Sequence, residues 1–320
     1  MKGFDTRFAD FPDYILGTTR EIWENRGLRA RMKEYYHPEV IVRMPGGISF
    51  GENALSAATM SALTEFPDHV LLGEDVIWSG SPEVGMLASH RQLACATHAR
   101  DGAFGPATGR KIEYRVIADR YAKNNRISDE WVIRDSAAMV HQLGFSVKEW
   151  ARDRISALDP DTQPFRPAID VQGPYTGRGN DNQWGHAFAA LLGRIMEGEN
   201  SVIADQYDRA VQAEYPGGTS VHGIAEVDAF WLGLRAAFPS ATFAIHHRIG
   251  MDDANMSPRA AIRWSLSGKH DGWGAFGAPT GAEVHVMGIS HAEFGPRGLR
   301  REWTLYDATA IWMQILAHQG

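Results

Sequence analysis

Cysteine is almost absent from this chain, since Cys95 is the only one among 320 residues. A disulfide within the chain and a cluster of thiolate metal ligands are therefore excluded, and so little cysteine fits a reducing compartment, which leads us to expect a cytoplasmic protein. No stretch approaches the ~20 apolar residues that a membrane-spanning helix needs, and the first residues lack the apolar core of a secretion signal.

Positive charge is also in short supply. The chain has 32 Lys and Arg against 39 Asp and Glu, which gives a formal net charge of −7. No basic stripe is available to neutralise phosphates, and no basic helix could lie on a membrane surface. We therefore expect neither a nucleic acid nor a membrane as a partner.

The sequence lacks two common signatures of nucleotide and metal sites. The sequence has no GxxxxGK[ST] loop and no HExxH pair. His246 and His247 are adjacent on an expected strand and point to opposite faces, while His285 and His291 lie about 20 Å apart along one strand. We therefore expect a protein that works without a metal or other cofactor.

One stretch of the chain occurs twice. Residues 102–135 return, altered, as residues 274–307, with a constant offset of 172 and no gap. The offset pairs Phe104 with Phe276 and Trp131 with Trp303, among others. A repeat of this length predicts a tandem duplication of one domain. We expect a first domain over 1–145, a linker rich in Pro and Gly over 146–180, and a second domain over 181–320.

Hydrophobic periodicity predicts the same order of elements in both halves. In the first half we expect helices over 13–36 (with a break at 25–27), 52–65 and 136–143, and strands over 39–44, 69–78, 86–98, 110–121 and 127–135. In the second half we expect helices over 182–197, 199–206 and 223–237, and strands over 208–215, 241–250, 259–268, 282–293 and 299–307. Helices followed by a run of antiparallel strands indicate an α+β fold with the helices on one face of a curved sheet.

This order of elements and its motifs resemble the SnoaL-like polyketide cyclases, or ester cyclases, of the nuclear-transport-factor-2-like superfamily. The motifs are Arg91, His98, Thr108-Gly109, Asp119-Arg120, Glu130-Trp131 and Asp135, and in the second half Arg263-Trp264, His270, Thr280-Gly281, Glu302-Trp303 and Asp307. The resemblance implies two cone domains, each a curved antiparallel sheet wrapped on N-terminal helices around an apolar pocket. It also implies an intrachain pseudo-dimer through the outer sheet faces, and leaves open whether two chains form a homodimer.

Strand alternation suggests which side chains face that pocket. Glu113, Arg115, Ile117, Asp119 and Tyr121 share one face of their strand. In the cyclases that the chain resembles, an aspartate on this strand is the general acid/base, and the resemblance carries that role to Asp119. An apolar pocket would raise the pKa of the carboxyl toward neutrality. The alternative is that Asp119 forms a structural ion pair with Arg120 or Arg91.

Other candidates follow from their places in the two halves. His98 is expected to polarise or protonate the substrate carbonyl, although its repetition as His270 equally fits a structural role. His291 stands where the first half has Asp119, so the halves are not expected to run the same reaction. The remaining candidates are expected to contact the substrate: Arg91, Phe104, Arg115, Tyr121 and Trp131 in the first half, and Arg263 and Trp303 in the second. For the two arginines at 91 and 263, a structural bridge between strands is the alternative to binding a substrate carboxylate.

The function expected from these residues is that of a cofactor-free cyclase acting on a small, apolar, polyketide-like carbonyl compound by intramolecular aldol chemistry. Hydrolysis and dehydration begin with the same proton transfer and are not separated from it. The alternative is a non-catalytic protein that binds an apolar small molecule. A pocket filled by its own aromatic side chains would favour that alternative.

Overall fold

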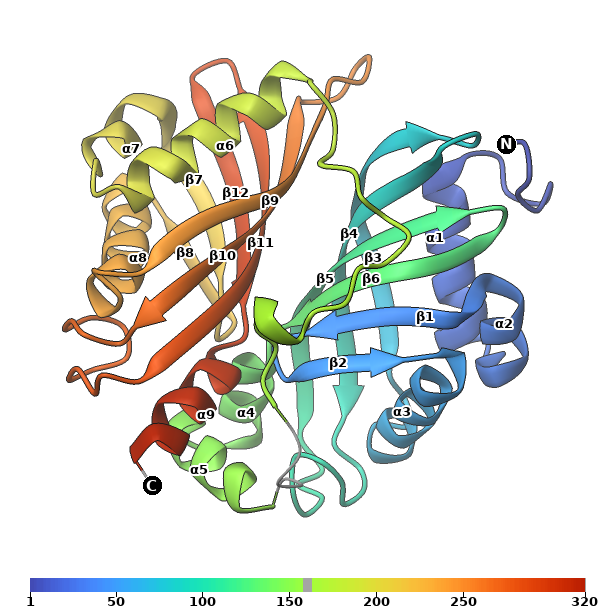
Figure 1. Cartoon of the computed structure of the whole chain (residues 1–320), viewed down its shortest axis with the longest axis horizontal. Helices are drawn as coiled ribbons and strands as arrows, with labels where there is room; N and C mark the ends of the chain where they lie inside the picture. The colour runs from blue at the N-terminus through green and yellow to red at the C-terminus, as the bar shows by residue number, and fades with distance from the viewer. Residues whose placement is uncertain (158–162, 320) are drawn as a thin grey trace. The chain divides into compact units, whose positions relative to one another are not determined.

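The computed structural model describes residues 1–157 and 163–319. The chain divides into two compact units (Figure 1). Unit 1 comprises Met1–Phe145 and Phe165–Gly177, and unit 2 comprises Ser146–Pro164 and Arg178–Gly320. The segment expected as a linker is thus shared: its helix α5 (Val147–Ala157) belongs to unit 2, and Phe165–Gly177 belongs to unit 1.

Unit 1 follows the expected order of elements closely. Its elements are α1 (Phe11–Thr19), a π-helical turn η1 (Arg20–Glu24), α2 (Leu28–Tyr35), β1 (Tyr36–Met44), β2 (Gly47–Phe50), α3 (Glu52–Glu65), β3 (Val70–Ser81), β4 (Gly85–Thr97), β5 (Lys111–Lys123), β6 (Arg126–Arg134), α4 (Ser136–Leu143) and the short 3-10 helix η2 (Pro167–Ile169). Helix starts are set by local capping, as where the side chain of Asp135 accepts a 3.0 Å hydrogen bond from the backbone N–H of Ala138. Gly144 ends the same helix with a φ of 92°, a conformation that glycine adopts without strain.

Unit 2 repeats this plan. Its further elements are α6 (Gln183–Met196), α7 (Ser201–Gln206), β7 (Tyr207–Tyr215), β8 (Thr219–His222), α8 (Ile224–Ala237), β9 (Thr242–Met251), β10 (Arg259–Lys269), β11 (Glu283–Gly295), β12 (Gly298–Tyr306) and α9 (Ala308–Gln319). Helix α9 was not expected from the sequence. Its Gln314 makes the two hydrogen bonds with the backbone of His285 that Gln142 of α4 makes with Glu113, so the repeat extends to the end of both units.

Each unit contains one six-stranded sheet. The strand orders are β2-β1-β6-β5-β4-β3 and β8-β7-β12-β11-β10-β9. The expected α+β fold with two cone domains is confirmed, with one difference in the sheets. Neighbouring strands are antiparallel except that β1 runs parallel to β6 and β7 runs parallel to β12, so both sheets are mixed.

The helices of unit 1 cover the sheet face that carries Arg120. Its guanidinium donates a 3.0 Å hydrogen bond to the hydroxyl of Thr19 at the end of α1. We call this face the inner face and the opposite one the outer face. Asp119, the neighbour of Arg120 on β5, points to the outer face because side chains alternate along a strand.

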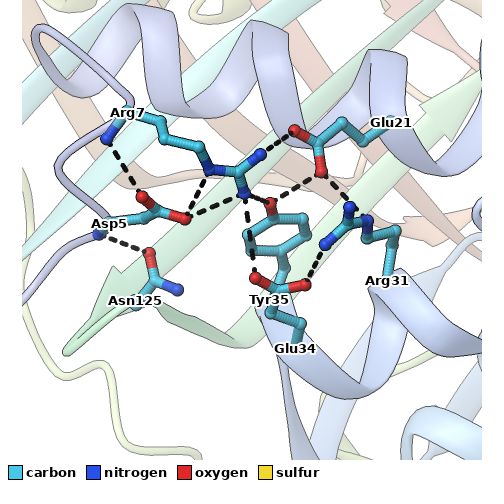
Figure 2. A network of polar contacts seen from close by, with 7 residues as sticks. All are labelled: Asp5, Arg7, Glu21, Arg31, Glu34, Tyr35 and Asn125. Carbon is cyan, nitrogen blue, oxygen red and sulfur yellow. Dashed lines mark hydrogen bonds and ion pairs between the residues drawn. The ribbon is translucent and has the colours of Figure 1, made fainter.

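A polar network holds the N-terminal segment against the first helices (Figure 2). Arg7 pairs with Glu21 of η1 at 3.0 Å and donates a 2.7 Å hydrogen bond to the hydroxyl of Tyr35 in α2. That hydroxyl donates to the other carboxylate oxygen of Glu21 at 2.7 Å. Since Arg7 is half exposed, its ion pairs contribute modestly to stability, but the network ties η1 to α2 at the edge of the interior.

Residues 165–177 form a strap on the outer face of the sheet in unit 1. Buried Arg43 of β1 pairs with Asp129 of β6 at 2.9 Å and with Asp170 of the strap at 2.5 Å. The backbone N–H of Tyr175 donates to Asp129 at 2.7 Å, and the ring of Tyr175 lies 4.8 Å from that of Tyr121. The strap is therefore an integral part of unit 1.

Candidate functional site

The inner face of unit 1 carries buried polar atoms with no hydrogen-bond partner among the described residues. His90 and Gln92 of β4 are 0 % and 1 % exposed. Nε2 of His90 and both amide atoms of Gln92 lack a partner. Buried polar groups are nearly always paired, so an unpaired group in a native fold points to a bound molecule or to water.

Gly73 of β3 lies beside these atoms. It lies opposite Gln92 in the sheet register. A methyl group at Gly73 would lie 3.3 Å from Nε2 of His90 and would collide with the terminal carbon of Leu16 from α1. The absence of a side chain at this position therefore lets the side chain of Leu16 lie next to the two polar residues.

His69, the residue before β3, extends the polar surface toward the start of that strand. One of its ring nitrogens, Nε2, lies 2.8 Å from the hydroxyl of Tyr114, and the other, Nδ1, is buried without a partner. Trp23 of η1 lies with its ring 5.3 Å from the imidazole. Burial lowers the pKa of His69 to about 4, so the ring is neutral at pH 7.

An ion pair lies on the other side of His90. Arg120 of β5 pairs with Glu130 of β6 at 2.5 Å, and both are buried. The guanidinium also lies 3.2 Å from Nδ1 of His90. Burial, and then the nearby Arg120, lower the pKa of His90 well below its ordinary value. The inner face thus presents a neutral imidazole whose two nitrogens have different surroundings.

In unit 2 the corresponding positions are apolar. Ile245 stands for Gly73, Ile262 for His90 and Trp264 for Gln92, at the same places in the sheet register. The rings of Trp264 and Trp231 lie 6.0 Å apart, and both side chains are fully buried. The interior of unit 2 is filled where that of unit 1 is polar.

Unit 2 nevertheless keeps one carboxyl on its inner face. Glu302, which matches Glu130, is 0 % exposed and accepts 2.6 Å hydrogen bonds from Tyr207 and Thr304. Burial raises its pKa, although these hydrogen bonds act in the opposite direction. Sequence reasoning missed His69, His90 and Gln92 but had one signal for them: the offset of 172 replaces all three with apolar residues.

The face expected to line the pocket is the outer face in the structure. Asp119 is 1 % exposed there, opposite Ser89 and Trp131 on the neighbouring strands. Arg120 and Arg91, the two ion-pair partners considered for Asp119, pair with Glu130 and Glu74.

The other predicted residues of that face lie with Asp119. Arg115 shares Glu74 with Arg91 at 3.0 Å. The hydroxyl of Tyr121 donates to the backbone carbonyl of Val84, and Trp131 lies under the guanidinium of Arg43 at 4.6 Å. Phe104 is the exception, because its ring packs on Phe66 and on Arg134 of the inner face.

His98 is not brought near Asp119. It lies nine positions after Ser89, the residue opposite Asp119, which corresponds to about 30 Å of extended chain. Its imidazole lies between Glu65 at 3.2 Å and Thr108 at 3.1 Å. Glu65 also accepts hydrogen bonds from the backbone of residues 103 and 104, so this set of contacts holds a loop.

The candidates in unit 2 are distributed in the same way. His270 repeats the contact of His98, with Thr280 at 3.1 Å. His291 is fully buried on the outer face opposite Trp303, and Arg263 shares that face. The structure therefore places His291 and His270 on different parts of the sheet.

The described residues show neither a metal cluster nor a dinucleotide fingerprint at the start of a helix. No group of three His, Cys, Asp or Glu side chains that could hold a metal occurs in residues 1–157 and 163–319. Residues 272–277, GWGAFG, have the spacing of a dinucleotide fingerprint but connect two strands, β10 and β11, whereas that fingerprint opens a helix. None of the described helices is long and apolar enough to cross a membrane.

Each half of the chain matches a model of a known protein family. Residues 14–143 match the family model described as SnoaL-like polyketide cyclase, and residues 186–302 match the one described as SnoaL-like domain. No curated protein matches the chain significantly.

Many solved structures are similar to one half of the chain. IdmH from Streptomyces antibioticus is 22 % identical, with a TM-score of 0.35, over 40 % of this chain and 97 % of its own. A SnoaL-like polyketide cyclase from Agrobacterium tumefaciens is 19 % identical, with a TM-score of 0.33, over 42 % of this chain and 98 % of its own.

Proposed function

Because the chain is a tandem of two SnoaL-like domains, we propose that it is a cyclase-type enzyme whose reaction takes place in the interior of unit 1. The observation that carries this proposal is the set of unpartnered buried polar atoms on His69, His90 and Gln92. They lie on the sheet face that the helices cover, where an apolar carbonyl compound would be shielded from water. Unit 2 has Ala241, Ile262 and Trp264 at the matching positions and would serve as a support.

We assign the proton acceptor to His69 in place of Asp119, because His69 faces the interior and Asp119 the outer face. When Nε2–H donates to the oxygen of Tyr114, Nδ1 carries a lone pair toward the interior. A neutral imidazole in this form can take a proton from a carbon that lies between two carbonyl groups.

The proposed reaction is an intramolecular aldol closure. The C–H proton moves to Nδ1 of His69, and the electron pair that it leaves is delocalised onto the adjacent carbonyl oxygen. The resulting enolate carbon attacks a second carbonyl carbon of the same molecule, a C–C bond forms, and the new alkoxide takes the proton back from His69. The substrate is isomerised, and no oxidant or reductant is consumed.

A turnover assay tests this proposal. The full chain is incubated with apolar β-keto esters that carry a second carbonyl within closing distance, and ring formation is followed by chromatography. We expect turnover by the wild type and a loss of 100-fold or more in the turnover rate of His69→Gln. The control variant Cys95→Ser should keep the wild-type rate, because Cys95 lies on the outer face of β4. Binding without turnover in the wild type would instead support a non-catalytic protein for an apolar small molecule, the function that the filled interior of unit 2 favours.

A further inference from the structure

The two ring nitrogens of His90 differ in a way that fixes its tautomer. Nδ1 lies 3.2 Å from a guanidinium nitrogen of Arg120. Since arginine only donates hydrogen bonds, Nδ1 must accept, and a neutral imidazole then carries its single proton on Nε2. Nε2 is the buried atom that has no partner, and it points toward Gly73. The inner face therefore presents an unused N–H donor.

Gln92 adds a second donor to the same surface. It is the next inner-face residue along β4, about 7 Å from His90, and its amide has no partner at either atom among the described residues. The positive charge of Arg120 is already matched by Glu130 at 2.5 Å. Among the described residues, the surface around His90 thus offers neutral donors and no unpaired cation, which suits a neutral carbonyl oxygen better than a carboxylate.

We propose that His90 and Gln92 together bind a carbonyl oxygen of a neutral ligand, and that Arg120 is a positioning residue that holds His90 with its proton on Nε2. This inference rests on the proposed function for its reaction and adds the group that holds the oxygen on which negative charge develops. Donors aimed at such an oxygen from a water-free interior are effective because they need no reorganisation during the reaction. Glu130 acts through Arg120, whose guanidinium it orients.

The residues that replace Arg120 and His90 in unit 2 explain why that unit cannot bind a carbonyl oxygen in this way. Ala292 stands at the position of Arg120, and Ile262 at that of His90. Both the donor and the residue that orients it are thus missing there. A glutamate is present at this position in both units, as Glu130 and Glu302, so it does not distinguish them.

The first experiment reads the tautomer directly. Long-range ¹H–¹⁵N NMR spectra of the full chain, with the His90 signals identified by their loss in His90→Leu, should show a protonated Nε2 and an unprotonated Nδ1. In the double variant Arg120→Met, Glu130→Gln, which removes both charges together, the preference should be lost. A protonated Nδ1 in the wild type, or an unchanged tautomer in the double variant, would overturn the positioning role.

The second experiment measures binding. Benzoylacetone, an apolar β-diketone that is neutral at pH 7, serves as the probe in calorimetric titrations. We expect His90→Leu and Gln92→Leu each to weaken its affinity at least 10-fold, His90→Gln to keep affinity within about threefold, and Cys95→Ser to match the wild type. Circular dichroism confirms that each variant is folded.

The outcomes separate this inference from the proposed function. Failure of the wild type to bind benzoylacetone, or equal binding by the wild type and both leucine variants, would refute the carbonyl site. Binding that depends on His90 and Gln92 without any ring closure would refute the enzyme and leave the carbonyl site standing. Turnover that is unaffected by His90→Leu would do the reverse.

Discussion

Arg120 and Ala292 stand at matching positions on the inner faces of the two units, and they give the facing glutamates opposite surroundings. Glu130 has the Arg120 guanidinium at 2.5 Å. Glu302 forms no ion pair in the part of the chain that the structure describes, and it is held by the hydroxyls of Tyr207 and Thr304. The same position of the repeat thus carries an ion-paired glutamate in unit 1 and, in unit 2, a glutamate whose carboxyl binds a proton more readily.

We expect Glu302 to make the stability of unit 2 fall as the pH rises. Burial raises its pKa above the ordinary 4.5, so the folded unit binds the proton more tightly than the unfolded chain does. This contribution is complete below pH 4.5 and is lost as the pH rises through the folded-state value. Urea unfolding between pH 4.5 and 8.5 should show a flatter dependence in Glu302→Gln. The exposed Glu283 provides the control variant Glu283→Gln, and equal slopes in all three proteins would contradict the prediction.

Glu130→Gln should destabilise unit 1 by about 3–5 kcal/mol, because it leaves the buried guanidinium of Arg120 without its counter-charge. The double variant Arg120→Met, Glu130→Gln removes both charges and should cost clearly less. Urea unfolding of both variants at pH 7 measures the difference. If the single variant proved as stable as the double one, the ion pair would not be the relevant contact.

Gly73→Ala should block the interior of unit 1. The added methyl group would occupy the space 3.3 Å from Nε2 of His90, and Leu16 would have to move its terminal carbon. We expect at least a 10-fold loss of benzoylacetone affinity. The matched control is Gly46→Ala, where an added methyl group meets no atom within 4 Å. A loss of similar size in the control would show that the effect is not local.

The rate of the proposed reaction should fall only when the pH drops through about 4. His69 is active as the neutral imidazole, and burial holds its pKa at about 4, so the active form predominates at every higher pH. The pH profile of turnover measures this. A decline centred near the ordinary histidine value of 6.5 would mean that a different, solvent-exposed histidine accepts the proton.

Asp119→Asn should retain turnover within about threefold of the wild type. Asp119 lies on the outer face, away from the unpartnered atoms of the inner face. The assay of the proposed function applies without change, with His69→Gln as the positive comparison. A 100-fold loss in Asp119→Asn, in a protein that remains folded, would return the role of base to this residue.

Local patterns predicted the elements well, and helix 52–65 has the same bounds in sequence and structure. Which face of a strand meets the helices was harder to predict. Residues 117–122 of β5 are buried without interruption, so both faces read as interior and the usual alternation of apolar and polar residues disappears. The choice of Asp119 over Arg120 therefore had no support from periodicity, and it selected the face opposite to the one that the helices cover.

The polar residues of the inner face could not be predicted from the sequence for a related reason. His69, His90 and Gln92 are separated in sequence and come to share the inner face only through the register of β3, β4 and β5. A lone histidine in a strand gives no signal of its own. Their replacement in the second half was visible, but it acquires a meaning only when the inner face is known.

The division of the chain between the units limits how it can be recombined. The chain passes from unit 1 to unit 2 after Phe145, back after Pro164, and over again after Gly177. A break after Phe145 gives a first fragment without its strap, and a break after Gly177 gives a second fragment without α5. Neither half is therefore a contiguous cassette, and an exchange of one domain with a single-domain relative would have to transfer two separate stretches of sequence.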